Sequence, residues 1–595
     1  MHSYTAPLQD MQFLLFDVLK VQEQGNAIPA YAEATADVVS AILEEGGKFC
    51  GQVLHSINRS GDEEGCSFDN GKVKTAAGFK EAYDKFIAGG WNGVGCDPAF
   101  GGQGLITPVT FLFEEMMCAC NLSFGLFPGL TRGAYGALVV HGTEAQKNTY
   151  LPKMVAGTWS GTMNLTEPQC GTDLGLLKTR AEPQADGSFK LFGTKIFISA
   201  GEHDLTENII HLVLARLPDA PAGVKGISLF LCPKVLVNDD GALGARNAVT
   251  CGALEKKMGI KASPTCVMNY DGATAWLVGQ PNKGLSAMFT MMNGERLAVG
   301  VQGLGIADMA YQGAADYAKN RVQMRSATGT KYPDKVADPI IVHADVRRML
   351  LRMRSLTEGC RALALWIGQE LDISMLHPDP ERRREADDLV ALMTPVVKAM
   401  LTDQGFAAAN DAVQIHGGHG FIREWGMEQL VRDARITQIY EGTNGIQAID
   451  LVGRKLTLNM GRLVRRFFHP VQAYIDRQLA QPAPAATIAP LASAFAQLQE
   501  TTLWLNKVGA SNPEDRLAGA TDYLRMFGLV AIGYLWARMA QEANTLRVAR
   551  ADPFYDTKIM TAHFYMTKIL PETSSLMASI MAGGGPVMAL PEDAF

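Results

Sequence analysis

The sequence predicts an α+β protein in which a helical domain, a β domain and a helical bundle follow one another, and a further helical domain ends the chain. Apolar residues recur at helical spacing before about residue 160 and again after residue 284, whereas alternating segments fill the region between them. The regular βα alternation that builds a parallel sheet is missing. We therefore expect domains at residues 1–160, 161–283, 284–455 and 456–595, the third being a four-helix bundle.

Length and composition set broad limits on function. A chain of 595 residues is too long for one hydrophobic core, and its 47% hydrophobic and 19% charged residues are typical of a soluble protein. The formal net charge of −7 provides no broad positive field, which binding to a phosphate backbone requires. We therefore expect no nucleic-acid partner.

The predicted β domain has clear strand and turn signals. Segments 195–199, 209–217 and 226–231 are rich in β-forming residues, and Asp186-Gly187 precedes an alternating run. A second Asp-Gly pair, Asp271-Gly272, separates the runs 265–270 and 273–278. Because such pairs favour tight hairpin turns, the sequence predicts a hairpin at each of them.

The C-terminal part is predicted to be helical with one interruption. Residues 480–490 are rich in Pro and Ala and predict a linker, and amphipathic helices follow it. The most apolar late segment, residues 527–539, is shorter than the roughly 20 residues that span a bilayer. We therefore expect a buried helix there and no membrane span.

The N-terminus and the cysteines indicate a cytoplasmic protein. The first residues lack both the basic, apolar pattern of a secretory signal and the Arg-rich pattern of a transit peptide. Ten cysteines are scattered over the chain without the spacing of a zinc site or a redox pair. Free thiols in a reducing compartment are the expected state.

Two glycine-rich segments raise the question of a nucleotide site. Residues 300–305 lack the Gly-x-Gly-x-x-Gly spacing of dinucleotide-binding proteins and lie within a helical pattern, where glycines permit close helix packing. The segment Gly417-Gly418-His419-Gly420 instead leaves backbone amides free to approach a ligand. His416 and His419 have the spacing of metal ligands, but the glycines between them favour a turn or cofactor contact, and no metal site is expected.

Four segments together resemble the signature blocks of acyl-CoA dehydrogenases, in the same order and at similar spacing. They are residues 164–173 (Asn-Leu-Thr-Glu-Pro-Gln-Cys-Gly-Thr-Asp), 195–199 (Lys-Ile-Phe-Ile-Ser), 411–421 (Asp-Ala-Val-Gln-Ile-His-Gly-Gly-His-Gly-Phe) and 439–447 (Ile-Tyr-Glu-Gly-Thr-Asn-Gly-Ile-Gln). The resemblance covers roughly residues 40–455, and the helical, β, helical order agrees with that family's fold. Residues 4–11 and the added C-terminal domain resemble the family's longer subfamily.

The chemistry of such a family can be stated independently. Removing two hydrogens from the Cα–Cβ bond of an acyl thioester needs a base over Cα and hydrogen-bond donors for the developing enolate oxygen. It also needs a hydride acceptor, which no amino-acid side chain provides and a flavin does. The resemblance implies that FAD is the cofactor and that the donors are the base's own amide and a ribityl hydroxyl.

Glu441 is the candidate base, and a second carboxylate competes with it. Glu441 lies in a turn before a predicted helix, where Asn444 and Gln447 have the spacing of a capping box. The alternative role for Glu441 is that of a solvated loop residue. Glu295 aligns with the place from which some family members supply the base, but it could also pair with Arg296 or another arginine as a structural residue.

The resemblance also implies a set of cofactor contacts. Phe197 stands where a tryptophan is common, and packing in the core of a strand is its alternative role. Met324 and Arg325 replace the usual Phe-Gly after the segment that reaches the pyrophosphate. The candidate flavin-binding residues are Met163, Leu165, Thr166, Phe197, Ser199, Arg321, Gln323, Gln414, Gly417, Gly418 and Thr443.

Substrate contacts and partners follow from the same resemblance. The candidate substrate-binding residues are Thr172, Arg296, Tyr440 and Gly442, although an arginine such as Arg296 is often only part of a surface ion pair. The expected product is a 2-enoyl-CoA, and the expected electron acceptor is an electron-transfer flavoprotein. A flavin site shared between subunits implies a homodimer or tetramer.

The acyl group is predicted from the subfamily alone. The longer subfamily implies 3-methylmercaptopropionyl-CoA, an intermediate of dimethylsulfoniopropionate catabolism, with a medium or long fatty acyl-CoA of β-oxidation as the alternative. An acyl-CoA oxidase that passes electrons to oxygen is a second alternative. The third is a nucleic-acid-associated flavoprotein, for which Arg462, Arg465 and Arg466 form a basic cluster in an otherwise acidic chain.

Overall fold

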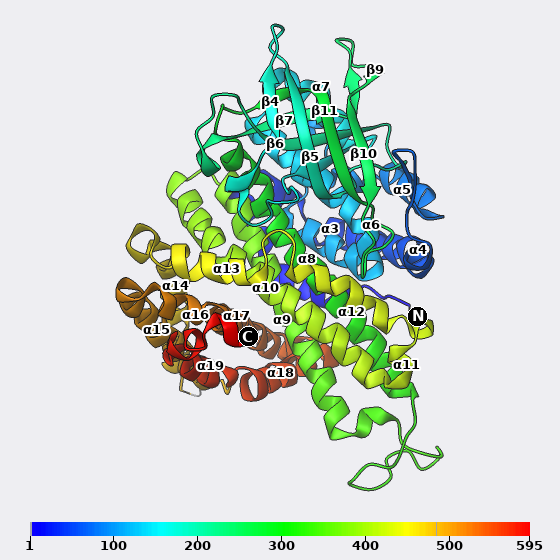
Figure 1. Cartoon of the computed structure of the whole chain (residues 1–595). Helices are drawn as coiled ribbons and strands as arrows, with labels where there is room; N and C mark the ends of the chain where they lie inside the picture. Colours follow the sequence, from blue (N-terminus) through cyan, green and yellow to red (C-terminus); the bar gives the residue numbers. More distant parts are fainter. Residues whose placement is uncertain (1–2, 483–484) are drawn as a thin grey trace. The chain divides into compact units, whose positions relative to one another are not determined.

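The chain folds into two compact units, which are described here separately. The computed structural model describes residues 3–482 and 485–595. Unit 1 comprises Met1–Gly47, Ile106–Ala119 and Val299–Phe595, and unit 2 comprises Lys48–Leu105 and Cys120–Ala298 (Figure 1). The strands of the central β region lie in unit 2 and the C-terminal helices lie in unit 1, which confirms the predicted α+β class. The four-domain division of the sequence remains a proposal.

Unit 2 is built around one sheet of seven strands. In order along the sheet, β10, β11, β5, β4, β6 and β3 are neighbours, and β7 pairs with both β11 and β6, so that five of the strands form a closed ring. The strands of this unit are β1 (Ser67–Asp69), β2 (Lys72–Lys74), β3 (Trp159–Asn164), β4 (Arg180–Pro183), β5 (Phe189–Ser199), β6 (Asn208–Arg216), β7 (Ile227–Pro233), β8 (Val235–Val237), β9 (Leu243–Arg246), β10 (Val249–Leu254) and β11 (Thr265–Val278).

The inside of the ring is apolar. Side chains from β4, β5, β6, β7 and β11 meet there and are fully buried. They include Ala181, Leu191, Val213, Phe230 and Ala273. Burial of this kind contributes about 25 cal/mol per Å² of apolar surface, so the ring is the stable base on which the loops at its edge are held.

One of the two predicted hairpins is present and the other is wrong. Asp186 and Gly187 lie in the turn between β4 and β5, as expected. Asp271-Gly272 does not form a turn, because β11 continues through it from Thr265 to Val278. The pairing of β11 with β5 shifts by one residue there, and Gly272 has a φ of 77°. The left-handed conformation that glycine allows is used in a β-bulge rather than in a hairpin turn.

Two long helices, α6 (Thr107–His141) and α8 (Gly284–Asn320), contribute residues to both units. The helix α6 is interrupted at Asn121, which has a φ of −163° and a ψ of 89°. The Asn121 side chain accepts a hydrogen bond of 3.0 Å from the amide of Phe124 and donates one of 3.2 Å to the Leu54 carbonyl. The side chain thus supplies an acceptor for the amide of Phe124 where the helix is interrupted. The other helices that lie mainly in unit 2 are α4 (Asn58–Glu64), α5 (Phe79–Ala88) and α7 (Glu144–Val155).

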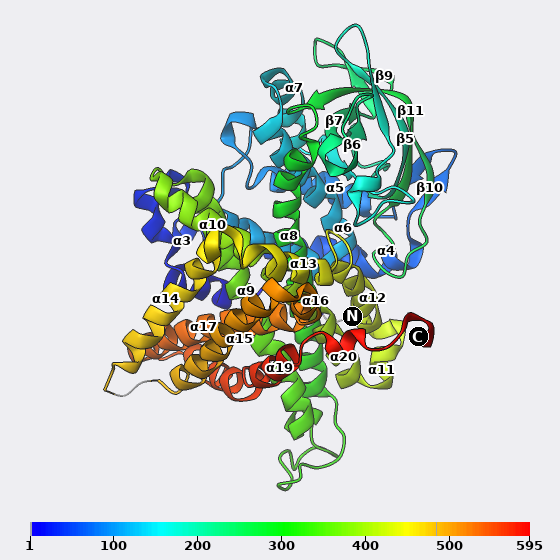
Figure 2. The same ribbon diagram turned by 60° about the vertical axis from the view of Figure 1, so that its left-hand side comes forward.

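Unit 1 is almost entirely helical. The helices α9 and α10 are joined by residues 377–379 and pack along each other (Figure 2). The helices of this unit are α1 (Leu8–Gln12), α2 (Pro29–Glu33), α3 (Ala36–Phe49), α9 (Ala344–Leu376), α10 (Pro380–His416), α11 (Gly418–Phe421), α12 (Met427–Arg435), α13 (Asn444–Asp450), α14 (Arg462–Leu479), α15 (Ile488–Ser511), α16 (Pro513–Ala518), α17 (Ala520–Ala549), α18 (Pro553–Phe564), α19 (Glu572–Met581) and α20 (Gly585–Met588).

The glycines of residues 300–305 let α8 cross α10 closely, as predicted. A Cβ added at Gly303 would lie 2.6 Å from the Leu401 carbonyl oxygen, and one added at Gly405 would lie 2.4 Å from the Gly303 carbonyl oxygen. Both distances are too short for any larger side chain without a shift of backbone. These glycines therefore have a packing role and do not form a nucleotide-binding loop.

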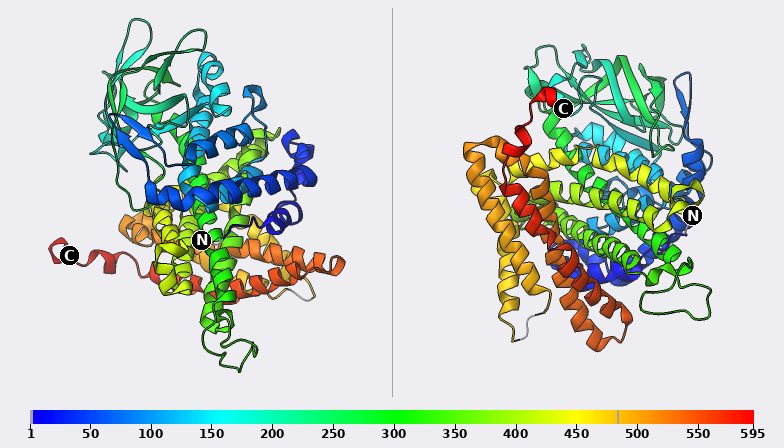
Figure 3. Two further views of the ribbon diagram at one scale, coloured as in Figure 1. Left: turned by 90° about the vertical axis from the view of Figure 1, so that its right-hand side faces the viewer. Right: turned by 60° about the horizontal axis from the view of Figure 1, so that its bottom comes forward.

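The appended C-terminal helices pack on the bundle. In the right-hand view of Figure 3, α14, α15 and α17 lie beside one another. The middle of α17, which contains the predicted residues 527–539, is buried, and Ile532 and Trp536 lie against Gly359 of α9. The predicted linker is shorter than expected, because residues 488–490 begin α15, and residues 483–484 within it are outside the described part of the chain.

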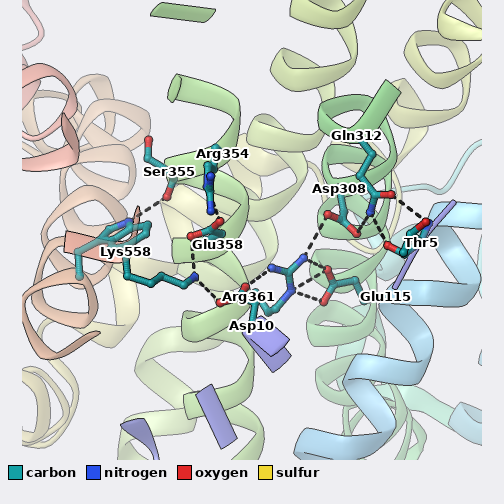
Figure 4. A network of polar contacts seen from close by, with 11 residues as sticks. Thr5, Asp10, Glu115, Asp308, Gln312, Arg354, Ser355, Glu358, Arg361 and Lys558 are labelled. Carbon is teal, nitrogen blue, oxygen red and sulfur yellow. Dashed lines mark hydrogen bonds and ion pairs between the residues drawn. The ribbon is translucent and has the colours of Figure 1, made fainter. Parts of the chain in front are cut away.

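A buried cluster of charged side chains joins four distant parts of unit 1 (Figure 4). The Arg361 guanidinium of α9, 1% exposed, donates to Glu115 over 2.9 and 3.0 Å from Nε and to Asp10 over 2.5 Å from Nη1. Lys558 of α18 donates to Asp10 and, over 2.6 Å, to Glu358. Asp10 of the N-terminal segment thus contacts both Arg361 of α9 and Lys558 of α18.

Among the described residues, α6 is the one helix with the length and apolar character that a membrane span requires. Its most apolar stretch is wholly buried in the folded protein, as expected for a core helix. All ten cysteines are free thiols.

Candidate active site

The candidate site residues are divided between the two units. Those of unit 2 include a group beside the end of β5. The amide of Ile196 donates to the Thr166 carbonyl over 2.9 Å, and Lys195 Nζ donates to the Leu165 carbonyl over 2.9 Å. These bonds hold the segment after β3 against β5. The structure thereby brings together the five predicted flavin contacts of this unit, Met163, Leu165, Thr166, Phe197 and Ser199.

Phe197 has an unusual conformation at the edge of the sheet. Its φ is 60°, a left-handed value that bulky residues rarely adopt, and its side chain is 59% exposed. Ile196 and Phe197 together oppose Val267 of β11, so that Phe197 occupies a β-bulge. The exposure excludes core packing as its role. A strained, exposed aromatic residue at this edge supports a ring-stacking contact with a ligand.

A buried ion pair fixes the two segments to each other. Lys195 Nζ donates to Glu167 Oε1 over 2.8 Å, and the two side chains are 0% and 3% exposed. Burial lowers the pKa of Lys195 to about 8, although the negative charge of Glu167 acts to raise it. Burial raises the pKa of Glu167, but the Lys195 charge and hydrogen bonds from Lys195, Thr179 and Lys178 outweigh it and hold that pKa at about 2.

Replacing Lys195 by Met should destabilise unit 2 by about 3–5 kcal/mol, because it leaves the Glu167 carboxylate buried without its counter-ion. The measurement is the free energy of unfolding in urea. The double variant Lys195→Met, Glu167→Gln removes both charges and should recover much of the loss. A single variant as stable as the wild type would show that the pair is not needed to hold this segment.

Arg321 and Gln323 lie in unit 1, at the start of the long excursion, the loop of residues 321–339 that follows α8. Backbone bonds from Gln323 N to Asp338 O, 2.9 Å, and from Asp338 N to Met324 O, 2.8 Å, close the base of this excursion. The buried Asp338 carboxylate accepts hydrogen bonds from backbone amides of the excursion, such as that of Tyr332 at 2.8 Å. Arg321 and Gln323 are exposed on a segment with a fixed backbone.

The glycine turn after α10 lies near the end of α8. The Tyr317 ring stacks on His416 with centroids 4.2 Å apart, and the Tyr317 hydroxyl is 2.9 Å from His419 Nδ1. The two histidines belong to an aromatic cluster that also includes Trp425, and no group of three His, Cys, Asp or Glu side chains among the described residues could hold a metal ion. The contacts of Tyr317 therefore place the last turn of α8, which precedes Arg321, against the end of α10 and the glycine turn that follows it.

Glu441 lies in a tight turn of unit 1 between residue 438 and α13. Glu441 and Gly442 have φ values of 56° and 85°. A left-handed glutamate costs about 1–3 kcal/mol, whereas glycine adopts this conformation freely, so the surroundings must impose the backbone of Glu441. Gln447 Nε2 donates to the carbonyls of Glu441, 3.3 Å, and Gly442, 3.1 Å.

The N-cap of α13 differs from the prediction. Thr443, not Asn444, is the cap, and its hydroxyl accepts a hydrogen bond of 3.3 Å from the amide of Ile446. The Asn444 side chain points to α10 instead, where buried partners satisfy it better than a helix terminus would. Tyr440 is held by a hydrogen bond from its hydroxyl to Gln302 of α8.

The rival carboxylate, Glu295, lies in unit 2 and is buried. Glu295 is 7% exposed, and its Oε1 would lie 2.4 Å from a Cβ added at Gly133. Burial lowers the pKa of the adjacent Arg132, and the negative charge of Glu295 opposes this effect. Of the remaining candidates in this unit, Thr172 is exposed in the loop after residue 170, and Arg296 is partly buried.

The residues present are compatible with FAD. A Cβ added at Gly417 or at Gly418 would meet no atom within 4 Å, so the backbone of this turn is open to a ligand. Arg321 is exposed, and arginine suits a diphosphate through paired hydrogen bonds. The exposed ring of Phe197 suits a flat aromatic ligand. An exposed aromatic ring in unit 2, and an exposed arginine and an open glycine turn in unit 1, are groups that suit a flavin-dependent enzyme.

Comparison with known proteins identifies the family. Models described as the N-terminal, middle and C-terminal domains of acyl-CoA dehydrogenase match residues 44–158, 162–273 and 282–456, and one described as acetyl-CoA dehydrogenase C-terminal like matches residues 467–591. A relative that is 44% identical extends over 98% of this chain. The chain belongs to the acyl-CoA dehydrogenase family, and it is an FAD-dependent oxidoreductase that acts on acyl-CoA thioesters.

Two relatives and one solved structure illustrate the similarity. The 44% identical relative is 3-methylmercaptopropionyl-CoA dehydrogenase of Ruegeria pomeroyi, of which 99% is covered. Butyryl-CoA dehydrogenase of Syntrophomonas wolfei is 36% identical over 100% of this chain and 99% of its own length. The structure of Caenorhabditis elegans ACDH-11 in complex with C11-CoA is 20% identical and has a TM-score of 0.74, covering 95% of this chain and 91% of that one. At that identity it shows the shared fold.

The sequence did not indicate several residues that shape the site. Glu167, Lys195 and Gln447 belong to the matched blocks, but nothing in the pattern shows that they are buried partners of the backbone beside the site. Lys398 and Thr402 lie one turn apart on α10 and are both 0% exposed. The sequence does contain one signal for Lys398 and Thr402: two polar residues at helical spacing within an otherwise apolar segment indicate buried polar contacts.

Proposed function

We propose that this enzyme oxidises 3-methylmercaptopropionyl-CoA to the corresponding 2-enoyl-CoA and that Glu441 is the catalytic base. The observation that carries the assignment of the base is the strained turn at Glu441, whose carbonyl and that of Gly442 are held by Gln447. A general base must be held within hydrogen-bond reach of the proton that it removes, and this turn fixes the carboxylate at a helix start.

The proposed reaction begins with transfer of the α-proton to the Glu441 carboxylate. The Glu441 amide donates a hydrogen bond to the thioester oxygen while negative charge develops on it. FAD, when bound, supplies the hydride acceptor for the β carbon. Tyr440 and Gly442 flank the base and contact the substrate. Thr172 and Arg296 are also proposed substrate contacts.

The cofactor contacts form two proposed groups. Met163, Leu165, Thr166, Phe197 and Ser199 would surround the flavin ring, and Arg321, Gln323, Gln414, Gly417 and Gly418 would hold the diphosphate of the FAD. Thr443 is a further proposed flavin contact. The exposure of Phe197 and the open space around Gly417 and Gly418 support these roles. We assign the second group to the FAD of a neighbouring subunit, so that the enzyme is a homodimer or tetramer.

Glu295 is the less suitable base. It is buried in unit 2, and its negative charge acts on the neighbouring Arg132. Its helical backbone in α8 shows no strain that a catalytic role would explain. We therefore assign Glu295 a structural role.

The choice of acyl group rests on the most similar relative named above. It is 44% identical over nearly the whole chain, against 36% for the butyryl-CoA dehydrogenase. A medium or long straight-chain acyl-CoA remains the alternative. We further propose that an electron-transfer flavoprotein reoxidises the enzyme and that the protein is cytoplasmic, which its ten free thiols support.

The basic cluster gives no support to nucleic-acid binding. Arg462 donates to Asp388 over 2.8 and 2.9 Å, and Arg466 donates to Glu385 over 2.7 Å. Carboxylates of α10 therefore neutralise two of the three arginines. The helix face that they occupy is an internal contact of unit 1.

The test is anaerobic bleaching of the bound flavin by a panel of acyl-CoAs. The matched pair is 3-methylmercaptopropionyl-CoA and pentanoyl-CoA, which differ by a sulfur in place of one methylene. Faster bleaching by the thioether supports the substrate, whereas faster bleaching by pentanoyl-CoA, butyryl-CoA or a longer chain contradicts it and leaves the reaction class intact. Rapid peroxide formation in air without an added acceptor would instead identify an oxidase.

A further inference from the structure

Asn444 is held more tightly than a residue in the first turn of a helix requires. Its Oδ1 accepts a hydrogen bond of 2.8 Å from Lys398 Nζ, and its Nδ2 donates to Asp403 Oδ1 over 2.7 Å and to Thr402 Oγ1 over 3.0 Å. All three partners lie on α10, and Lys398 and Thr402 are 0% exposed. Both ends of one amide are thus used to dock the start of α13 on α10.

The same helix also holds the other side of the Glu441 turn. Gln438 Nε2 donates to Asp403 Oδ1 over 2.7 Å, so a single carboxylate oxygen accepts from a residue before the turn and from Asn444 after it. The turn between these anchors contains the left-handed Glu441 and Gly442. Asp403 and Asn444 therefore set the separation of the two ends of the turn.

We infer that Asn444, through its amide contacts with Asp403 and Lys398, is a positioning residue that fixes the Glu441 carboxylate in its working place. The position of the carboxylate depends on the backbone of the turn, and the bonds of Gln438 and Asn444 to α10 set the position of that backbone. A displacement of about 1 Å in a catalytic group lowers a rate by roughly 100-fold, so loss of one anchor affects the chemical step before it affects binding. This inference rests on the proposed role of Glu441.

Asn444 donates and Asp403 accepts in their hydrogen bond, so the two residues can be interchanged as a test. In Asn444→Asp, two carboxylates face each other where an N–H donor met a carboxylate over 2.7 Å. In the double variant Asn444→Asp, Asp403→Asn, the donor and the acceptor are exchanged. In that double variant the new amide at position 403 would turn its Nδ2 toward position 444 and its Oδ1 toward Gln438, in place of the one Asp403 oxygen that accepts both bonds in the wild type. The Lys398 contact is kept in both variants.

The measurements are kcat and KM of the FAD-loaded enzyme with its fastest acyl-CoA, together with the thermal unfolding midpoint. For Asn444→Asp we expect kcat to fall roughly 10- to 100-fold with KM little changed. The double variant should regain most of this loss. Asn512→Asp is the matched control, because Asn512 caps α16 through a 3.1 Å bond to the Glu514 amide, and it should keep the wild-type kcat.

Two results would overturn the inference. One is an Asn444→Asp variant whose unfolding midpoint falls while kcat stays at the wild-type value, which would make Asn444 purely structural. The other is a double variant that regains the midpoint but not kcat. If Asn444 acts through Glu441, Asn444→Asp should add little further loss to Glu441→Gln. If Glu441→Gln itself is fully active, the proposed base is wrong, which separates that failure from failure of the positioning role.

Discussion

Glu441→Gln is expected to reduce bound flavin roughly 10²- to 10⁴-fold more slowly than the wild type, the range for loss of a general base. The amide has nearly the same shape as the carboxylate, and the bonds from Gln447 go to backbone carbonyls that the substitution leaves in place. The turn should therefore persist while proton removal from Cα is lost. Rapid mixing with the fastest acyl-CoA under anaerobic conditions measures the effect.

Glu295→Gln is the matched control for this experiment. It makes the same chemical change at a buried carboxylate beside Arg132, where we expect lower thermal stability but a flavin reduction rate close to that of the wild type. A large loss of rate in Glu295→Gln with an active Glu441→Gln would reverse the assignment of the base. The reaction class and the fold would be unaffected by that result.

Arg361→Met is expected to destabilise unit 1 by about 5 kcal/mol, which is comparable to the whole stability of many domains. Methionine fills much of the volume but leaves Glu115 and Asp308 buried without the guanidinium that now lies 2.5 and 3.3 Å from them. Asp10 retains Lys558. Urea unfolding of the FAD-loaded protein measures the loss, and aggregation of the variant during expression is the extreme outcome.

Glu115→Gln is the milder comparison in the same cluster. Burial raises the pKa of Glu115 to about 7 from its ordinary 4.5, although the charge of Arg361 opposes the rise. The folded protein therefore holds a proton that the unfolded chain has released, and the contribution of this group to stability falls as the pH rises from about 4.5 to about 7. Glu115→Gln should flatten that part of the stability profile. Equal destabilisation by Arg361→Met and Glu115→Gln would contradict a central role for Arg361.

The sequence predicted the order of the elements because the periodicities of helix and strand are local. The buried middle of α17 and the close crossing of α8 and α10 follow directly from runs of apolar residues and from glycine spacing. The Asp271-Gly272 bulge shows the limit of such signals. The same dipeptide suits a hairpin and a bulge, and the pairing of β11 along the whole of β5 decides between them.

The sequence predicted the candidate site residues but not the contacts that hold them in position. Glu441 is marked by its motif, whereas its left-handed conformation and the docking of Asn444 on α10 depend on side chains distant in sequence. A capping residue was expected at Asn444 because asparagine often caps helices. Buried donors and acceptors on α10 provided a more favourable set of partners, and Thr443 became the cap.

The charged cluster around Arg361 also has a consequence for how the protein is made. Asp10 leaves the ribosome 548 residues before Lys558, and the two side chains form a buried ion pair. Until α18 has been synthesised, Asp10 and Glu358 lack one of their two cationic partners within a half-built core. Completion of unit 1 therefore waits for the synthesis of α18, and until then the nascent chain presents an unfinished apolar and ionic surface of the kind that chaperones bind.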